Sequence, residues 1–315
     1  MLDLKRLRVL REVAQQGSFS AAAESLYVSQ SAISQQIAAL EAETGVPLLL
    51  RLRSGPVLTD AGELLVGHAD AAICRLEEAE RELGELAGLG AGEVRLISFP
   101  SANATIVATA GARFRRAHPD IGLRISEAEP EDALPRLKRG DFDLAVLYDF
   151  ELSPFEDDRD LELTPLMTER MHAMVGTGHE LAGSDGVRLE QLAGEQWLCG
   201  TTEGSCRQLT MRSCEGAGFV PNIAFESDDY TVMQSLVAEG LGVTLIPDLA
   251  LASLNPRVRV LPILPEPPVR RVWAATLVAG SRSGATEAML EVLEAEAAGF
   301  QPGNQLGAAA APAAA

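Results

Sequence analysis

Apolar residues near the start of the chain recur every three or four positions, which is the spacing of one face of an α-helix. This pattern predicts a first helix over about residues 4–16. Ser18 or Ser20 can cap a second helix through residues 21–26, because a serine hydroxyl accepts hydrogen bonds from the unpaired N–H groups of a first turn. After a tight turn, a third helix follows over about residues 30–43.

The third helix has two faces of different character. Its apolar face carries Ile33, Ile37 and Leu40, and its outward face carries Ser31, Ser34, Gln35 and Ala38. Residues 47–59 then predict a short β-hairpin with its tip at residues 54–55. These elements form a helix-turn-helix with a wing, whose serine and glutamine side chains can hydrogen-bond to base edges in a major groove. From the spacing alone, a structural helical hairpin with a solvated face is about equally supported.

A single long helix is predicted from about residue 59 to residue 87. Apolar residues along it recur in alternating steps of four and three, at Leu65, Ala69, Ala72, Leu76, Ala79, Leu83 and Leu86. This is a heptad pattern, which is typical of a coiled-coil seam. The alternative is a helix packed on its own domain. Its position between two domains favours a dimer helix, for which Leu65, Ala72, Leu76 and Leu83 are the candidate contacts.

After residue 92 the pattern changes to strands that alternate with helices. Strands are predicted at residues 93–99, 122–128, 143–148, 171–175, 196–200, 223–227, 243–247 and 270–278, and helices at residues 103–117, 130–139, 207–217, 230–238 and 286–298. Such alternation favours parallel sheets with helices on both faces. More than 200 residues of it indicate two α/β lobes with a cleft between them. Residues 301–315 are low in complexity and are expected to be disordered.

The composition limits the classes of function. The chain has 315 residues and a formal charge of −19, which argues against nucleic-acid binding over the whole surface. Residues 1–60 nevertheless hold six basic and six acidic side chains, so a local DNA-binding face remains open. Because the N-terminus has no apolar signal core and no run is long enough to span a membrane, we expect a cytoplasmic protein with reduced cysteines.

The stretch FSAAAESLYVSQSAISQQIAALEAETGVPLLLRLRSGPVLTDAGELL closely resembles the N-terminal signature of LysR-type transcriptional regulators. The segments GHELA and LVAEGLGVTLIP fit the effector domain of that family, and the resemblance covers about residues 1–298. It implies a winged helix-turn-helix over residues 1–58, a linker and dimerisation helix over residues 59–88, and an effector domain over residues 91–300. That domain would resemble a periplasmic binding protein, with lobe one at 91–163 and 268–300 and lobe two at 164–267.

The same resemblance implies the partners of the protein. They are double-stranded operator DNA, a small-molecule effector, RNA polymerase and further copies of the chain in a homodimer or homotetramer. It implies no enzymatic activity, no cofactor and no metal. For DNA, it gives base-facing roles to Gln30, Ser31, Ser34 and Gln35, and phosphate or minor-groove roles to the wing residues Arg51 and Arg53.

For the effector, the resemblance and the predicted fold point to residues on both sides of the cleft. Ser101 stands where the first strand enters its helix, a place that suits a hydroxyl donor to an anion. The other candidates are Asn103, Glu129, Pro130 and Tyr148 on lobe one and Thr201, Thr202 and Ser227 on lobe two. Because some members of the family have an arginine at the place of Tyr148, this tyrosine argues against a strongly anionic effector.

The cysteines offer an alternative within the same family. A peroxide sensor of the family has its paired cysteines in the stretch that here holds Cys206 and Cys214, so a thiol switch is conceivable. Their spacing differs from that of the sensor, and inert buried cysteines are the preferred interpretation. Two other rivals are a small-molecule-binding protein without a DNA role and an enzyme that uses Cys206. The first lacks a signal peptide, and the second lacks an identifiable base.

Overall fold

The computed structural model describes residues 2–52, 55–86, 92–151, 154–155, 158–201, 204–278 and 282–301. The chain divides near residue 90 into two compact units, each of which is described by itself. No helix in the described ranges is both long enough and apolar enough to cross a membrane.

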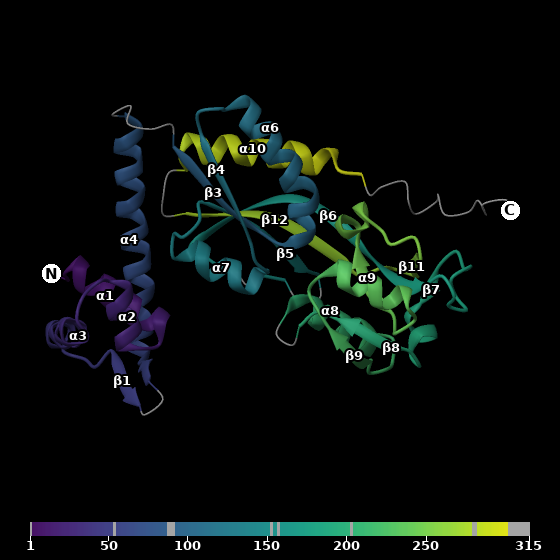
Figure 1. The fold of residues 1–315 in the computed structure, drawn as a ribbon, viewed down its shortest axis with the longest axis horizontal. Helices are drawn as coiled ribbons and strands as arrows, with labels where there is room; N and C mark the ends of the chain where they lie inside the picture. The colour runs from purple at the N-terminus through teal and green to yellow at the C-terminus, as the bar shows by residue number, and fades with distance from the viewer. Residues whose placement is uncertain are drawn as a thin grey trace. The chain divides into compact units, whose positions relative to one another are not determined.

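The N-terminal unit is a winged helix-turn-helix followed by a long helix, as the sequence predicts (Figure 1). Its elements are α1 (Leu4–Gln16), α2 (Phe19–Ser25), α3 (Gln30–Thr44), β1 (Leu49–Leu52), β2 (Gly55–Leu58) and α4 (Asp60–Leu86). Ser18, rather than Ser20, caps α2, since its side chain accepts from the N–H groups of Ser20 and Ala21. Ser29 caps α3 in the same way. The two caps fix where these short helices begin.

The core of this unit joins α1, α2 and α3 to the first half of α4. Leu10, Ile33 and Ile37 are almost fully buried in it. Ala69 and Ile73 of α4 are buried in the same cluster, against which Leu65 packs. The predicted heptad seam is therefore divided, because its first residues stabilise their own domain.

The C-terminal unit is built on one mixed sheet of eight strands in the order β4-β3-β5-β12-β6-β11-β7, with β10 also paired to β6. The strands are β3 (Glu93–Ser98), β4 (Gly122–Glu127), β5 (Leu144–Phe150), β6 (Leu161–Gly176), β7 (Val187–Arg188), β10 (Thr244–Pro247), β11 (Val258–Leu264) and β12 (Val269–Leu277). A separate parallel pair consists of β8 (Gln196–Cys199) and β9 (Asn222–Glu226).

The helices of this unit are α5 (Pro100–Ala102), η1 (Asn103–Val107), α6 (Ala108–Ala117), α7 (Pro130–Lys138), η2 (Leu189–Leu192), α8 (Ser205–Gly216), α9 (Tyr230–Ala238), η3 (Asp248–Ala252) and α10 (Gly284–Gly299). We call β3, β4, β5, β12 and the helices α5, α6, α7 and α10 the first lobe, and β8 to β11 with α8, α9 and η3 the second lobe. The long strand β6 takes part in both lobes, because its first part pairs with β12 of the first lobe and its last part pairs with β10 and β11 (Figure 1).

The prediction of parallel sheets was wrong in one respect. Strands β3, β4 and β5 are parallel, but β12 is antiparallel to both β5 and β6, and β10 and β11 are antiparallel to β6. Strand direction is set by pairing between distant segments, which the alternation of strands and helices does not reveal. The predicted strand at residues 171–175 is only the end of β6, and β11 was not predicted at all.

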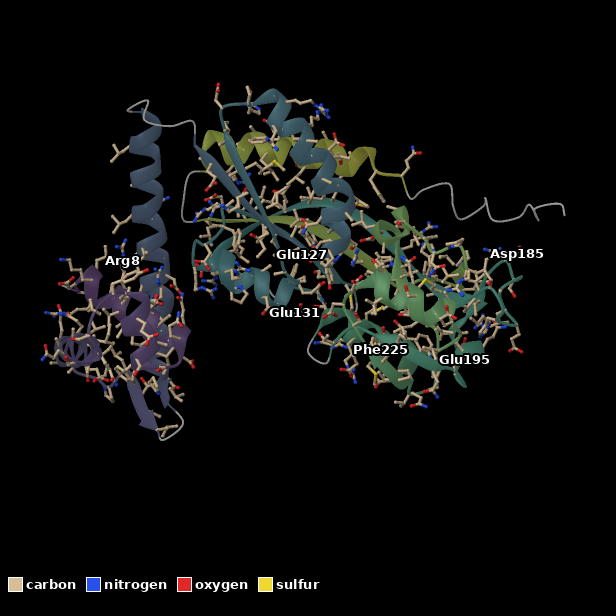
Figure 2. The ribbon with its side chains drawn as sticks, viewed as in Figure 1. Arg8, Glu127, Glu131, Asp185, Glu195 and Phe225 are labelled. Atoms are coloured by element: carbon tan, nitrogen blue, oxygen red, sulfur yellow. The ribbon has the colours of Figure 1, made fainter. Side chains whose placement is uncertain are left out.

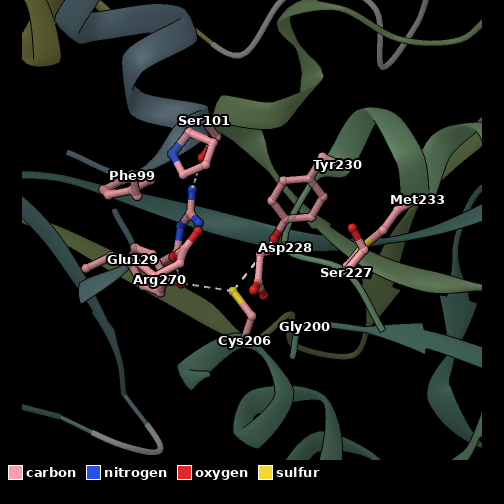
Figure 3. A pocket seen from close by; sticks show the side chains of 12 residues that line it. Phe99, Ser101, Glu129, Gly200, Cys206, Ser227, Asp228, Tyr230, Met233 and Arg270 are labelled. Carbon is pink, nitrogen blue, oxygen red and sulfur yellow. Dashed lines mark hydrogen bonds between the residues drawn. The ribbon is translucent and has the colours of Figure 1, made fainter. Parts of the chain in front are cut away.

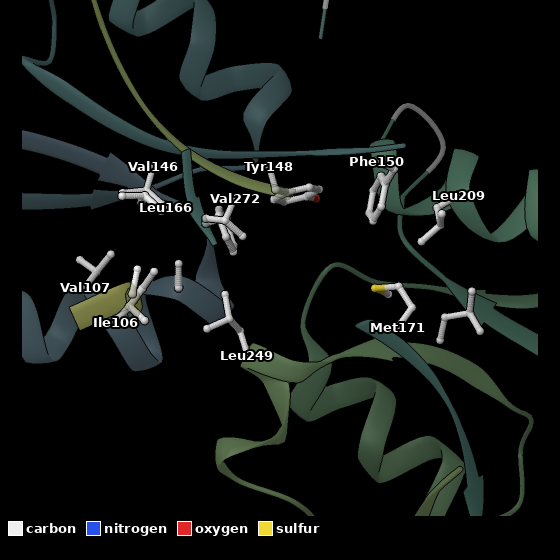
Figure 4. Packing of buried hydrophobic residues seen from close by; sticks show 14 of the residues in the cluster. Ile106, Val107, Val146, Tyr148, Phe150, Leu166, Met171, Leu209, Leu249 and Val272 are labelled. Carbon is white, nitrogen blue, oxygen red and sulfur yellow. The ribbon is translucent and has the colours of Figure 1, made fainter. Parts of the chain in front are cut away.

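Helices cover both faces of the first lobe, as predicted. Alternate residues of β3 point to opposite faces, so that Leu96 packs with Phe114 of α6 and Leu293 of α10, whereas Ile97 packs with Leu137 of α7. The larger cluster continues into the second lobe, where Leu209 and Leu249 belong to it (Figure 4). A shared core of this kind links the two lobes.

Candidate functional site

The predicted DNA-reading face of α3 is formed by polar side chains on the side opposite the core. Gln30, Ser31 and Gln35 are exposed, Ser34 is half-buried, and the apolar stripe of α3 is buried. Arg51 lies in β1 opposite Pro56, but its side chain lies outside the described part, as does the whole of Arg53. The arrangement leaves hydrogen-bonding groups of α3 open to a groove.

The second half of α4 carries apolar side chains that are exposed in the described part of the chain. Leu76 is 46% exposed and Leu83 is 65% exposed, and Ala72 is exposed as well. These three of the four predicted dimer contacts lie on the open part of the helix, whereas Leu65 packs against its own domain. An exposed leucine row on a long helix is the feature that a second helix would cover.

A pocket in the C-terminal unit brings together residues of both lobes (Figure 3). Its empty space is about 290 Å³, part of which is open to solvent. It is lined by Phe99, Pro100, Ser101, Glu129, Tyr148, Gly200, Cys206, Ser227, Asp228, Tyr230, Met233 and Arg270. Four of the eight predicted effector residues, Ser101, Glu129, Tyr148 and Ser227, are among them.

The remaining predicted effector residues do not line the pocket or are not described. Asn103 is half-buried and donates from Nδ2 to the Ser98 carbonyl and to Glu127. Pro130 is buried at the start of α7, and Thr201 is exposed beside Asp228. Thr202 lies outside the described residues.

Arg270 in the pocket wall belongs to a buried ion pair that was not predicted from the sequence. Arg270 is 1% exposed, and its Nε donates to Glu169 over 2.6 Å while its Nη2 donates to the Ser101 hydroxyl over 3.0 Å. Burial lowers the pKa of the guanidinium, but Glu169 together with Tyr230, Cys206 and Tyr148 raises it by more, so that pKa is raised overall. Arg270 is therefore a permanent cation in the pocket wall.

The tyrosine at position 148 was expected to disfavour a strongly anionic effector. Arg270 removes that ground, because it supplies a cation to the same pocket. Tyr148 on β5 is paired with Val272 on β12, and Arg270 lies two residues away on the same face of β12. A strand therefore places the guanidinium over the tyrosine ring, although no arginine stands at position 148. The adjacent arginines Arg270 and Arg271 at the start of a strand were the available signal, because alternation turns one of them inward.

Glu129 is an acidic group that lines the same pocket as this cation. Tyr148 donates from its hydroxyl to Oε2 of Glu129 over 2.7 Å. Burial raises the pKa of Glu129 to about 7, and the hydrogen bond from Tyr148 opposes that rise. At neutral pH the carboxyl is thus close to half protonated, so it can either accept or donate a hydrogen bond.

Cys206 closes the pocket from the second lobe as a thiol. The Tyr148 hydroxyl lies 3.2 Å and the Tyr230 hydroxyl 3.8 Å from its sulfur. Burial raises the pKa of Cys206 to about 11, and that of Cys214 to about 12. Both residues lie in α8, eight positions apart, which corresponds to about 12 Å along a helix axis. A disulfide needs Cα atoms within about 7 Å, so α8 would have to unwind to form one.

Two further carboxylates lie near the pocket, Glu131 on the first lobe and Asp228 on the second. Glu131 of α7, labelled in Figure 2, accepts from the N–H and the hydroxyl of Ser205 at the first turn of α8, and this contact bridges the two lobes. Asp228 accepts from the N–H of Thr201 over 3.0 Å and from its hydroxyl over 2.8 Å. Polar contacts therefore hold the lobes together around the pocket.

The ion pair between Arg270 and Glu169 is part of a larger buried hydrogen-bond network between β6 and η3. Glu169 of β6 also accepts from the N–H of Leu249 over 2.7 Å. Asp248 accepts from the N–H of Arg170 and from Nε2 of His172, at 3.0 and 2.7 Å. The pocket is thereby connected through β6 to η3 in the second lobe. Within the described ranges, no group of three or more potential metal ligands is found.

Comparison with known proteins gives matches along nearly the whole chain. Residues 4–63 match the family described as "Bacterial regulatory helix-turn-helix protein, lysR family", and residues 87–298 match the "LysR substrate binding domain". The chain is 30% identical over 272 residues to the transcriptional dual regulator GltC of Bacillus subtilis (strain 168), which covers 86% of this chain and 89% of that protein.

Two further similarities bear on the sites described above. The chain is 28% identical over 250 residues to the hydrogen peroxide-inducible genes activator of Dickeya chrysanthemi, covering 79% of this chain and 80% of that protein. Among solved structures, the full-length regulator CbnR in complex with its target DNA matches with a TM-score of 0.60 and 19% identity, covering 94% of this chain and all of that one (100%). The likeness to CbnR is one of fold.

Proposed function

Because the chain belongs to the LysR family of DNA-binding transcriptional regulators, which are not enzymes, we propose that a small molecule controls its action at a promoter by binding in the pocket between the two lobes. The observation that carries this proposal is the convergence of Ser101, Glu129 and Arg270 from one lobe with Cys206 and Tyr230 from the other. A pocket of a few converging polar groups among apolar walls is typical of a small-molecule site.

At the DNA, α3 would read bases with Gln30, Ser31, Ser34 and Gln35, and the wing would contact the backbone with Arg51 and Arg53. The exposure of Gln30, Ser31 and Gln35 supports the first part. A protein that acts on chromosomal DNA in bacteria works in the cytoplasm, which is the location we propose, and RNA polymerase is the partner through which it would act.

The exposed apolar row of α4 would form the contact between two copies of the chain. Leu76 and Leu83 support this assignment, because a leucine row that is open in one chain becomes buried when two helices pair. The domain boundaries proposed from the sequence suit this arrangement, with the linker helix over residues 59–88. A homotetramer would need a second contact between effector domains.

The ligand would act through the buried network that begins at its own site. A carboxylate bound to Arg270 would share the charge of the guanidinium with Glu169, and Glu169 also accepts from the N–H of Leu249 in the second lobe. A change at this carboxylate alters how the lobes pack, and a ligand that prefers one packing shifts the equilibrium toward it.

A thiol switch that uses Cys206 and Cys214 is the alternative within the family. The raised pKa of both thiols and their separation along α8 favour the small-molecule site. The name of the Dickeya relative concerns that protein and does not outweigh these two observations.

The decisive experiment compares wild type with Ser101→Phe in operator binding, with and without the effector. An operator is first selected from random duplexes, and an effector is then found by screening metabolites for a change in operator binding. We expect Ser101→Phe to bind the operator normally and to ignore the effector, because the ring fills the pocket. A variant that responds like wild type would place the effector elsewhere.

A further inference from the structure

The pocket is lined by groups of opposite charge. Arg270 supplies a fixed cation beside the Ser101 hydroxyl, while Glu129 and Asp228 supply carboxyl groups to the same space (Figure 3). We propose that the effector is a small zwitterion, such as an α-amino acid, whose carboxylate binds Arg270 and Ser101 and whose ammonium group binds Glu129 and Asp228. This inference rests on the proposed function of the pocket as the effector site.

The proposed site for the carboxylate of the ligand consists of hydrogen-bond donors that the other described residues of the protein do not use. Two guanidinium nitrogens of Arg270, Nε and Nη2, donate to Glu169 and Ser101, and no hydrogen bond from Nη1 is found within the described residues. The Ser101 hydroxyl accepts from Arg270 and has no acceptor of its own in the described part. A carboxylate can take one hydrogen bond from each of these groups, and hydrogen bonds of this charged kind are strong.

The ammonium end is defined by two carboxyl groups. Glu129 receives a hydrogen bond only at Oε2, from Tyr148, which leaves Oε1 without a donor in the described residues. Asp228 is held in place by Thr201, and each of its oxygens keeps a further lone pair for an ammonium proton. Burial raises the pKa of Glu129 to about 7, and a cation beside it would relieve the cost of its charged form.

Ligands with a single charge fit this pocket less well. A simple carboxylate would meet Arg270 but would also lie near Glu129 and Asp228, which repel it. A simple amine would meet the two acids but would lie near the permanent charge of Arg270. The small space, with Phe99 and Met233 in its wall, further favours a compact molecule.

The test measures binding of the twenty standard amino acids, one at a time, to the full chain by thermal shift and calorimetry. Each amino acid that binds is compared with its analogue without the amino group and its analogue without the carboxyl group. We expect at least one amino acid to bind and both analogues to bind at least about tenfold more weakly, since each lacks a charged hydrogen-bonding partner. Binding of either analogue as tightly as the amino acid, or of no amino acid at millimolar concentration, overturns the proposal.

Proton exchange gives a second readout that depends on the sign of the ligand charge. The titratable and charged groups that face Glu129 are Tyr148, Asp228, Arg270 and Glu131. An ammonium group at Glu129 lowers the pKa of that residue, so binding near pH 7 should release protons, whereas a lone carboxylate should cause proton uptake. Calorimetry in two buffers of different ionisation enthalpy measures the sign, and uptake on binding an amino acid contradicts the proposal.

Variants separate this inference from the proposed function. Glu129→Gln should abolish the proton release and weaken the amino acid at least about tenfold, while Glu127→Gln, an exposed residue outside the pocket, should change neither. Arg270→Met combined with Glu169→Met removes both buried charges together, which spares the fold an unpaired charge, and should abolish binding. If another class of ligand binds and Ser101→Phe abolishes its effect, the pocket remains the effector site and only the zwitterion is wrong.

Discussion

The guanidinium of Arg270 lies 4.6 Å from the centre of the Tyr148 ring. It also lies 4.9 Å from the ring of Phe99, so that two aromatic faces flank a fully buried cation. Such contacts stabilise a desolvated cation. The tyrosine at position 148 thus helps to hold the charge of the pocket in place, and the pairing of β5 with β12 brings the two residues together.

The first prediction separates base reading from backbone contact at the DNA. Gln35→Ala should lower affinity for the operator and leave affinity for random DNA nearly unchanged, because the proposed role of this exposed glutamine on α3 is to read bases. Arg51→Ala should weaken binding to both and reduce the slope of log K against log salt by about one. Salt titrations with operator and random duplexes measure both effects. Equal effects of the two substitutions on both DNAs would contradict the assignment.

The second prediction concerns the exposed row of α4. Leu76→Glu places a charge where two helices would pair, and should cost the assembly several kcal/mol because a buried charge lacks a partner. Sedimentation should show smaller particles. Ala71→Glu, an exposed position of the same helix outside the predicted seam, is the matched control and should leave the assembly intact. An unchanged oligomer in Leu76→Glu would mean that α4 pairs through another face.

The N-terminal unit was predictable because its signals are local. Helical spacing, capping serines and a short hairpin all depend on residues a few positions apart, and α3 begins where Ser29 caps it. The places of Ser101 and Glu129, a few residues after the ends of β3 and β4, were predictable for the same reason and from the family resemblance. These elements therefore needed no knowledge of distant contacts.

Pairing between distant segments explains what the sequence analysis missed. The direction of β12 depends on its pairing with β5 and β6, and that register decides that Arg270 faces the pocket. Asp228 lies in a loop whose shape depends on its bonds to Thr201, so its place in the pocket has no periodic signal. The division of the α4 seam depends on where Ala69 meets the core of its domain.

The third prediction follows from the raised pKa of Glu129. Its pKa is about 7 in the folded protein against an ordinary 4.5, so the folded state holds the proton more tightly than the unfolded chain does. The free energy of unfolding should therefore fall as pH rises between about 4.5 and 7, by up to about 3 kcal/mol from this group. Urea denaturation at several pH values should show that Glu129→Gln reduces this fall.

The control for the pH experiment is Glu127→Gln, which removes an exposed carboxyl group from the end of β4. It should leave the pH dependence of unfolding as in wild type. Were the two variants to give the same pH dependence, Glu129 would have an ordinary pKa, and its role as a half-protonated group in the pocket would be wrong.

The last prediction concerns the cysteines, for which the structure favours inert thiols. Because burial raises the pKa of Cys206 to about 11, very little thiolate is present at pH 7.5, and the thiolate is the form that peroxide or an alkylating reagent attacks. We expect iodoacetamide to label Cys206 in the folded protein at least about tenfold more slowly than in the urea-unfolded chain, as measured by peptide mass spectrometry. Operator binding should be equally insensitive to peroxide in wild type and in Cys206→Ser. A peroxide response in wild type that disappears in Cys206→Ser, with a disulfide to Cys214 in the oxidised protein, would instead require that α8 unwinds, and the thiol switch would replace the small-molecule site as the proposed function.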